Sequence, residues 1–283
     1  MRHTRWDAPA RRQALRSGRR RHPTRYLAMR LGRQPGRVWR GVRTYFRQAR
    51  QAAALDHNAI RTPRLVLDFP AWAMSRGENS LVDEGVPWIN FAARDALERA
   101  LGKSDKVFEF GSGGSTVFFA RRVGELTSIE YDPGWYETIR LTLERLDSRN
   151  WTYKLKPATR ESQAARDSAR QVYISDVPGF EEMSFAAFAS SIDEYPDAYF
   201  DWVLIDGRVR VGCFLHAHRK LRIGGHLVLD DAQRDRYRAV HAATQAANWP
   251  VRRYHGPGPK SNSFWETAIW TKTRDLQGIE PPS

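Results

Sequence analysis

The stretch KVFEFGSGGSTVFFARRVGELTSIEYD, residues 106–132, decides the fold. It begins with an apolar run, Val107 to Phe110, of the kind that a buried parallel strand needs. Residues with little side-chain bulk follow, Gly111 to Gly114, so the backbone there can approach a ligand closely. A helix then opens at Ser115, and its free N–H groups and positive end face the same cavity. The next strand, Leu126 to Glu130, ends in a carboxylate, so the stretch predicts a cradle for a nucleotide cofactor.

Two classes of cofactor use such a turn, and the spacing of residues distinguishes them. A dinucleotide fingerprint needs a third small residue that packs the helix onto the sheet, and Thr116 occupies that position. Glu109 precedes the first glycine by two residues, where a carboxylate would repel a pyrophosphate but suits a ligand with an ammonium group. Glu130 can bind both ribose hydroxyls in either class. An NAD-dependent oxidoreductase is therefore one alternative, and a turn that only closes a strand–helix junction is another.

Two apolar strands further along the chain also end in acids. Residues 200–208 read FDWVLIDGR, and residues 224–231 read GGHLVLDD. With the glycine-rich turn, these segments resemble the class I S-adenosylmethionine (SAM)-dependent methyltransferases, in particular a bacterial branch with LIDG and GG-x-LVLDD segments. The resemblance covers about residues 80–273.

The resemblance implies an α/β fold with a Rossmann-like, seven-stranded, mostly parallel sheet and helices on both faces. The alternation of strands and helices along the chain agrees with this expectation. Residues 251–254 and 264–272 are two extended segments around a Gly–Pro-rich loop, and they predict the C-terminal antiparallel hairpin of such a sheet. The chain is expected to be an enzyme, a SAM-dependent methyltransferase.

In this family the SAM turn reads acid-x-G-x-G-x-G/S, and the chain matches it position by position. The resemblance implies that SAM is bound at the carboxyl ends of the strands by Glu109, Gly111, Ser112, Gly113, Ser115, Thr116, Glu130, Tyr131 and Asp206. Trp135 could also border the adenine, and Trp88 the acceptor, although aromatic residues at such spacings are more often core. The third strand, near residues 152–157, lacks the acid that often meets the adenine amino group.

Three aspartates end the fourth and fifth strands and should converge at one edge of the sheet. We predict that Asp206 and Asp231 are catalytic and that Asp206, Asp230 and Asp231 bind Mg²⁺ through hard oxygen ligands. Metal-dependent O-methyltransferases resemble this arrangement. Such an ion would bring the acceptor hydroxyl close to the sulfonium methyl and lower the hydroxyl pKa. The alternative is that these aspartates order a loop, cap the sheet and start a helix.

Other polar residues near these strand ends could contact the acceptor. His255, the third predicted catalytic residue, and Lys260 flank the Gly–Pro-rich loop that should overhang the acceptor pocket, where either could be a general base or a substrate contact. Arg208 and Arg210 follow Asp206, and they could neutralise it or hold an acidic substrate group.

The segment after the fourth strand, Asp206 to Val209, bears on the acceptor. Enzymes that methylate amino groups of DNA and RNA resemble one another in an acid/asparagine-Pro-Pro-aromatic sequence there, whereas this chain reads DGRV. A nucleobase acceptor is therefore disfavoured. We expect methyl transfer to an oxygen, or with less support a nitrogen, of a small molecule or glycan.

Positive charge is concentrated at the start of the chain. Residues 1–50 contain 16 arginines, no lysine and one acid and carry +15, whereas the whole chain of 283 residues carries +14. This asymmetry predicts an Arg-rich extension over 1–57, a methyltransferase domain over 58–275 and a flexible tail over 276–283. The extension could bind nucleic acid or an anionic membrane. A non-catalytic protein of this fold that binds through its extension is therefore a further alternative.

Further features of the sequence predict individual helices and strands and the cellular location. We predict a helix over 26–55, a strand or extended segment over 60–69 and an amphipathic helix over 87–101. Cys213 is the single cysteine, which excludes an intramolecular disulfide and fits a reducing compartment. No apolar run approaches the roughly 18 to 20 residues of a membrane span. A cytoplasmic location, peripheral to a membrane through the extension, is the expectation.

Overall fold

The computed structural model describes residues 35–55, 61–77, 80–161, 169–175, 177 and 179–282. The chain divides into two units, residues 1–42 and 43–283. Helix α2 (Pro35–Leu55) begins in the first unit and continues into the second. The part of the predicted helix that precedes residue 35 lies outside the described residues. Among the described residues, no helix has the length and apolar character needed to cross a membrane.

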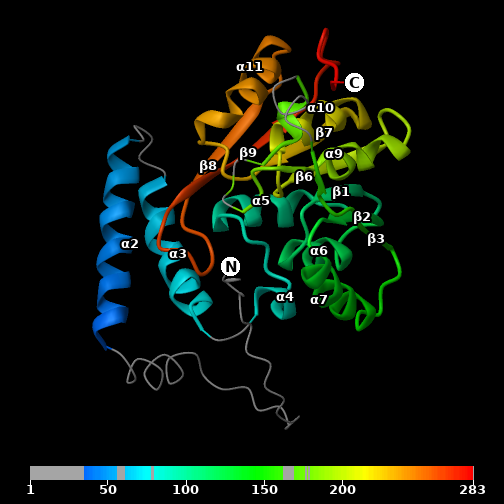
Figure 1. The fold of residues 1–283 in the computed structure, drawn as a ribbon. Coiled ribbons are helices and arrows are strands. Elements are labelled where there is room, and N and C mark those ends of the chain that lie inside the picture. The colour runs from blue at the N-terminus through cyan, green and yellow to red at the C-terminus, as the bar shows by residue number, and fades with distance from the viewer. Residues whose placement is uncertain are drawn as a thin grey trace. The chain divides into compact units, whose positions relative to one another are not determined.

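The second unit is built on a seven-stranded sheet with the strand order β3-β2-β1-β6-β7-β9-β8 (Figure 1). Its strands are β1 (Lys106–Phe110), β2 (Glu125–Glu130), β3 (Trp151–Leu155), β6 (Phe200–Ile205), β7 (Leu221–Leu229), β8 (Val251–Gly256) and β9 (Trp265–Thr271). The first five pair in parallel, whereas β9 is antiparallel to both β7 and β8. The predicted Rossmann-like methyltransferase sheet and its C-terminal hairpin are therefore confirmed.

Helices cover both faces of this sheet, as predicted. The longer helices of the second unit are α3 (Arg61–Ser75), α5 (Phe91–Ala100), α6 (Gly114–Ala120), α7 (Pro133–Glu144), α10 (Arg210–Lys220) and α11 (Arg238–Ala246), and all but α3 contribute to the two cores of the sheet. Short elements complete the unit: α4 (Leu81–Glu84), β4 (Thr159–Arg160), η2 (Ala169–Tyr173), β5 (Met183–Ser184), α9 (Ala186–Ala189), η3 (Ser190–Glu194) and η4 (Asp235–Tyr237).

Side chains alternate across the sheet and form a core on each face. Phe108 and Phe110 point to one face, where they pack with residues of α9, α10 and α11. Val107 points to the other face and packs with residues of α5, α6 and α7. Because β1 is covered on both faces, every side chain from Val107 to Phe110 is buried, including that of Glu109. The carboxyl ends of β1, β6 and β7 therefore carry the polar groups that can face a ligand.

Two predicted elements differ from the structure. Residues 61–75 form helix α3, not a strand, because Leu65, Phe69 and Trp72 recur at helical spacing and pack inward. Residue 60 lies outside the described residues. Helix α5 begins at Phe91, after the predicted start at residue 87, because the Asn90 side chain accepts a hydrogen bond from Ala93 N at 2.9 Å and caps it.

The second part of α2 packs with α3 and with the loop between β8 and β9. Tyr45 is 1 % exposed, its ring lies 5.1 Å from that of Phe264, and its hydroxyl donates to the Leu65 carbonyl at 2.5 Å. The structure thus places the division of the chain after Val42. Residues 43–55, which the sequence assigned to the 1–57 extension, belong to the folded unit.

The predicted flexible tail over 276–283 is packed where it is described. Leu276 is buried in the core that includes α10. The Ile279 carbonyl lies 3.1 Å from His218 Nε2, and Glu280 forms an ion pair with Arg219 at 2.9 Å. Residues 276–282 are therefore held against α10.

Candidate cofactor and active site

The glycine-rich turn after β1 fits closely against the end of β6. Gly111 has a φ of +91°, and a Cβ atom there would lie 2.6 Å from the Asp206 carbonyl oxygen. Only glycine satisfies both conditions. A Cβ on Gly113, in contrast, would meet no atom within 4 Å, and Gly113 lines a cavity. The turn therefore exposes bare backbone to that cavity while its first glycine closes against the sheet.

Hydrogen bonds of Ser112 hold this turn against β2, β3 and α7. Glu130 Oε2 accepts hydrogen bonds from Ser112 N at 3.1 Å and from Ser112 Oγ at 2.6 Å, and Oε1 accepts from two backbone N–H groups at the start of the next loop. The Tyr153 hydroxyl lies 2.7 Å from Ser112 Oγ, and Trp135 Nε1 donates to the Ser112 carbonyl at 2.8 Å. Both oxygens of Glu130 thus organise the backbone around the turn.

Glu109 is enclosed beneath the turn and does not line the cavity. Its Oε2 accepts hydrogen bonds from Thr116 Oγ1 at 2.7 Å and from Ser128 Oγ at 2.6 Å, and Thr116 Oγ1 in turn accepts from Gly113 N at 2.9 Å. Oε1 is buried without a hydrogen-bond partner. Burial raises the pKa of Glu109 to about 7, although the hydroxyl groups of Ser115, Ser128 and Thr116 oppose the shift. Glu109 therefore supports the turn from below.

This environment predicts a pH-dependent stability. Because the pKa of Glu109 is higher in the folded state, its protonation stabilises the protein at low pH, and that contribution disappears as pH rises through about 7. We expect ionisation of Glu109 to lower the free energy of unfolding of the wild type by about 3 kcal/mol between pH 4 and pH 8. Glu109→Gln, whose side chain stays neutral, should not show this decrease. Urea unfolding of both proteins at pH 4 and pH 8 measures this difference in the free energy of unfolding. The exposed Glu98→Gln is the control, and equal pH dependence of the wild type and Glu109→Gln would refute the role.

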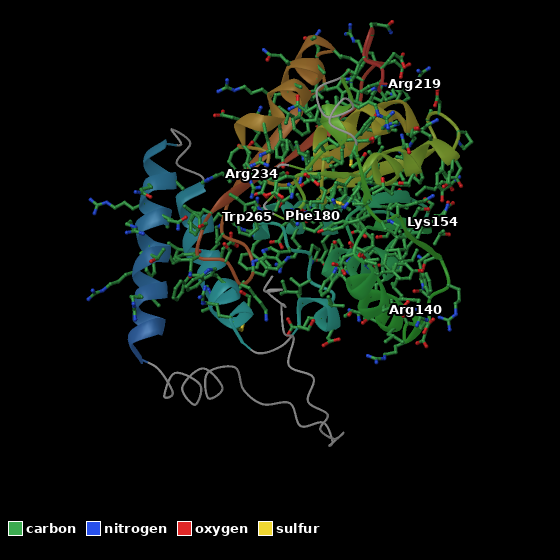
Figure 2. The ribbon with its side chains drawn as sticks, viewed as in Figure 1. Arg140, Lys154, Phe180, Arg219, Arg234 and Trp265 are labelled. Carbon is green, nitrogen blue, oxygen red and sulfur yellow. The ribbon has the colours of Figure 1, made fainter. Side chains whose placement is uncertain are left out.

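A cavity of about 610 Å³ lies beyond the carboxyl ends of β1, β6 and β7, as the sheet topology requires. Its lining combines the glycine-rich turn, the aspartates that follow β6 and β7, and the loop that leads into β9. Figure 2 labels two of its residues, Arg234 and Trp265. The lining residues are Trp88, Ser112, Gly113, Gly114, Ser115, Trp135, Asp206, Asp230, Asp231, Gln233, Arg234, Ser261, Ser263, Phe264 and Trp265.

Arg210 organises the three aspartates. Its Nη2 lies 2.8 Å from Asp206 Oδ1 and 3.4 Å from Asp231 Oδ2, and its Nη1 donates to the Asp230 carbonyl. Burial and the neighbouring Asp230 raise the pKa of Asp206 well above its usual range, against the opposing effect of Arg210. Asp231 also pairs with Arg234 at 2.7 Å. The guanidinium of Arg210 thus compensates carboxylates that would otherwise repel one another.

The predicted magnesium site is not supported by this arrangement. Asp230 Oδ1 accepts hydrogen bonds from Trp265 Nε1 at 2.8 Å and from Thr267 Oγ1 at 2.6 Å, while Asp206 and Asp231 share Arg210. Across the described ranges, no three His, Cys, Asp or Glu side chains are grouped so that they could hold a metal ion. A guanidinium occupies the position between the carboxylates that the sequence assigned to Mg²⁺.

Several predicted site residues lie outside the cavity lining. His255 lies on β8 opposite Glu266 and does not line the cavity. Lys260 Nζ donates to the Gly77 carbonyl at 3.2 Å, so its amino group is directed to the end of α3. Tyr131 packs its ring 5.2 Å from that of Phe185 and accepts a hydrogen bond from Arg208 Nε at 3.1 Å.

The predicted cofactor residues therefore fall into two groups. Ser112, Gly113, Ser115 and Asp206 line the cavity, whereas Glu109, Gly111, Thr116, Glu130 and Tyr131 surround it or hold the turn. Sequence reasoning missed Gln233 and Arg234, although they lie two and three residues after the acid pair that follows β7. It also missed Phe264 and Trp265, which it assigned only to the closing hairpin. Ser261 lines the cavity from the Gly–Pro-rich loop that was expected to overhang it.

Comparisons with known proteins complete the description. No family model matches the chain, and no curated protein matches it. Among solved structures, an rRNA methylase from Streptococcus thermophilus is 10 % identical, with a TM-score of 0.45 over 65 % of this chain and 95 % of that one. A methyltransferase-like protein from Silicibacter pomeroyi is 21 % identical, with a TM-score of 0.46 over 66 % and 89 %. M. jannaschii TYW2 in complex with AdoMet is 13 % identical, with a TM-score of 0.38 over 66 % and 76 %.

The strand order itself decides the fold. Five parallel strands are followed by a hairpin whose second strand inserts beside β7, and the glycine-rich turn follows the central β1. The chain has the class I methyltransferase fold. In this methyltransferase fold the cavity lies where a ligand of an open parallel sheet is expected, beyond the carboxyl ends of the strands.

Proposed function

We propose that the protein is a SAM-dependent methyltransferase that methylates an oxygen of a small molecule or glycan. The observation that carries the proposal is the glycine-rich turn at the end of β1, which presents bare backbone to a cavity of about 610 Å³. That volume is within the range of about 300–1,000 Å³ that is usual for small-molecule sites. A fold alone does not establish an activity, so the proposal rests on the residues of this cavity.

The residues present fit SAM. Ser112, Gly113 and Ser115 offer backbone and hydroxyl groups, and Trp135 offers an indole ring that is 41 % exposed at the cavity edge. Glu130 is held beside the turn, where its carboxylate could also accept ribose hydroxyls. The carboxylates of the cavity suit the positive charge of SAM. When bound, SAM would supply a methyl group on a cationic sulfur atom.

The chain's own contribution is to remove a proton from the acceptor. Asp206 lines the cavity, its side chain is 20 % exposed, and Arg210 fixes its orientation. Its raised pKa makes it a stronger base than an ordinary aspartate, which suits abstraction of a hydroxyl proton. We assign Asp206 as the general base. Asp231 lies between Arg210 and Arg234, so we assign it the positioning of these two guanidinium groups.

The aromatic and polar residues of the cavity lining suit a polar acceptor with a flat face. Phe264, Trp265 and the 56 % exposed Trp88 offer aromatic surfaces, and Ser261 and Ser263 offer polar groups. Aromatic rings beside hydrogen-bonding groups are a common lining for sugar rings and for planar molecules. A nucleobase could also lie on these aromatic surfaces, so the preference for an oxygen over a nucleobase nitrogen rests on the DGRV segment after β6.

The experiment that tests this function follows isotopically labelled methyl groups from SAM into a desalted cell extract incubated with the protein. We expect label in a small-molecule or glycan fraction, and labelling that is slower by about 10²-fold or more with Asp206→Asn. Label confined to RNA, DNA or protein would contradict the acceptor class, and the absence of any transfer would contradict the activity.

A further inference from the structure

Helix α3 exposes an apolar stripe formed by Val66, Leu67, Pro70 and Met74. Val66 is 61 % exposed, Leu67 72 % and Met74 61 %, and Pro70 is also exposed. The spacing of these residues places them on one side of the helix, opposite the side that packs inward. A contiguous group of large exposed aliphatic side chains is unusual on a soluble domain and marks an interaction surface.

Basic residues of α2 adjoin this stripe. Arg43, Arg47 and Arg50 are exposed and share one face of the helix because they lie four and three residues apart. Phe46, 48 % exposed, lies among them, and its ring is 5.1 Å from that of Phe69 on α3. Residues 43–55 contain no acid, and the contact between Phe46 and Phe69 joins the arginine-bearing face of α2 to helix α3.

We propose that this α2–α3 surface docks on a membrane that contains anionic phospholipids. The aliphatic side chains of the α3 stripe enter the boundary between headgroups and acyl chains, and the arginines of α2 bind lipid phosphates. The arginines complement the phosphate layer of a lipid surface, and the apolar stripe complements the acyl-chain boundary beneath it. The proposal is independent of the proposed catalytic function.

The chemistry favours lipid over other occupants. Single-stranded nucleic acid stacks its bases on aromatic or arginine planes, which only the α2 part of this surface offers. A strand bound there would leave the aliphatic stripe of α3 exposed to water. A second copy of the chain would bring two arginine clusters of the same sign together, at a cost in electrostatic energy. Insertion into lipid uses both features of the surface.

The test measures co-sedimentation of the full chain with phosphatidylcholine vesicles that do or do not contain phosphatidylserine. We expect binding to the phosphatidylserine vesicles only. The variant Leu67→Gln/Met74→Gln should lower the partition coefficient roughly tenfold, because two aliphatic side chains no longer enter the bilayer. The matched control is Leu141→Gln/Ile223→Gln, which alters aliphatic side chains that are 45 % and 51 % exposed elsewhere on the unit. The control should bind as the wild type does.

A second variant tests the charge, and its outcomes decide the proposal. Arg43→Gln/Arg47→Gln/Arg50→Gln should weaken binding by about fivefold per arginine removed. These side chains are exposed, so circular dichroism should show wild-type melting. Residues 1–42 are also arginine-rich, but attraction through them would not respond to Leu67→Gln/Met74→Gln. Equal vesicle binding of that variant and its control, binding to oligonucleotides alone, or dimerisation without vesicle binding would each overturn the proposal.

Discussion

Replacing Asp206 with asparagine is expected to lower the methyl-transfer rate constant by about 10²- to 10⁴-fold, because a positioned general base contributes acceleration of that order. Asparagine keeps the size of the side chain and an oxygen that can accept from Arg210 Nη2, which lies 2.8 Å from Asp206 Oδ1. It has no basicity. Turnover of labelled SAM, measured at saturating acceptor, gives the rate constant, and SAM affinity measured by calorimetry should change little.

The pH profile separates a base from a structural aspartate. A general base acts when deprotonated, so wild-type turnover should increase as pH rises through the raised pKa of Asp206. Asp206→Asn should lose this ascending limb. The matched control is Asp235→Asn, whose side chain is 86 % exposed and pairs only with Arg238 among the contacts described. An unchanged rate constant and profile for Asp206→Asn would show that another group takes the proton.

Replacing Glu130 with alanine is expected to weaken binding of SAM and of its demethylated product by at least tenfold. The loss has two physical causes. The carboxylate can no longer accept the ribose hydroxyls, and hydrogen bonds to a charged group contribute about 1.5–3 kcal/mol each. Ser112 also loses its acceptor at 2.6 Å, so the turn after β1 is less ordered before the ligand binds. Isothermal titration calorimetry measures both affinities.

The control for this prediction is Glu137→Ala on α7, which removes a carboxylate that is 57 % exposed and paired with Arg140. It should leave both affinities unchanged. If Glu130→Ala bound SAM as tightly as Glu137→Ala does, Glu130 would be a structural residue that only fastens Ser112, and the ribose would have to be recognised elsewhere.

The fold could be predicted from the sequence where local chemistry allows only one conformation. Gly111 needs a positive φ and lies against the Asp206 carbonyl, so its position marks the end of the central strand. The runs from Val107 to Phe110 and from Phe200 to Ile205 are apolar, apart from Glu109 and Asp201, because both sides of the sheet are covered. These segments located parallel strands along the chain, and with the resemblance they predicted the edge of the sheet at which the cavity opens.

Helix α3 and the details of the cavity depend on tertiary contacts that the sequence does not display. The run LVLDF is short and apolar, as a buried strand can be, and only the contacts of Tyr45 and Trp72 show that a helical face is buried there. Likewise, three aspartates can be read as metal ligands or as partners of a cation. Arg210, at the start of helix α10, lies between Asp206 and Asp231, and this arrangement does not support the magnesium site.

The central claim is that the cavity binds SAM, and titration of the full chain with SAM, its demethylated product and NADH in one calorimeter tests it most directly. We predict that SAM and its product bind at micromolar concentrations and raise the melting temperature, because a ligand that binds only the native state stabilises it. NADH should give no heat of binding. Tight binding of NADH without binding of SAM would contradict the account.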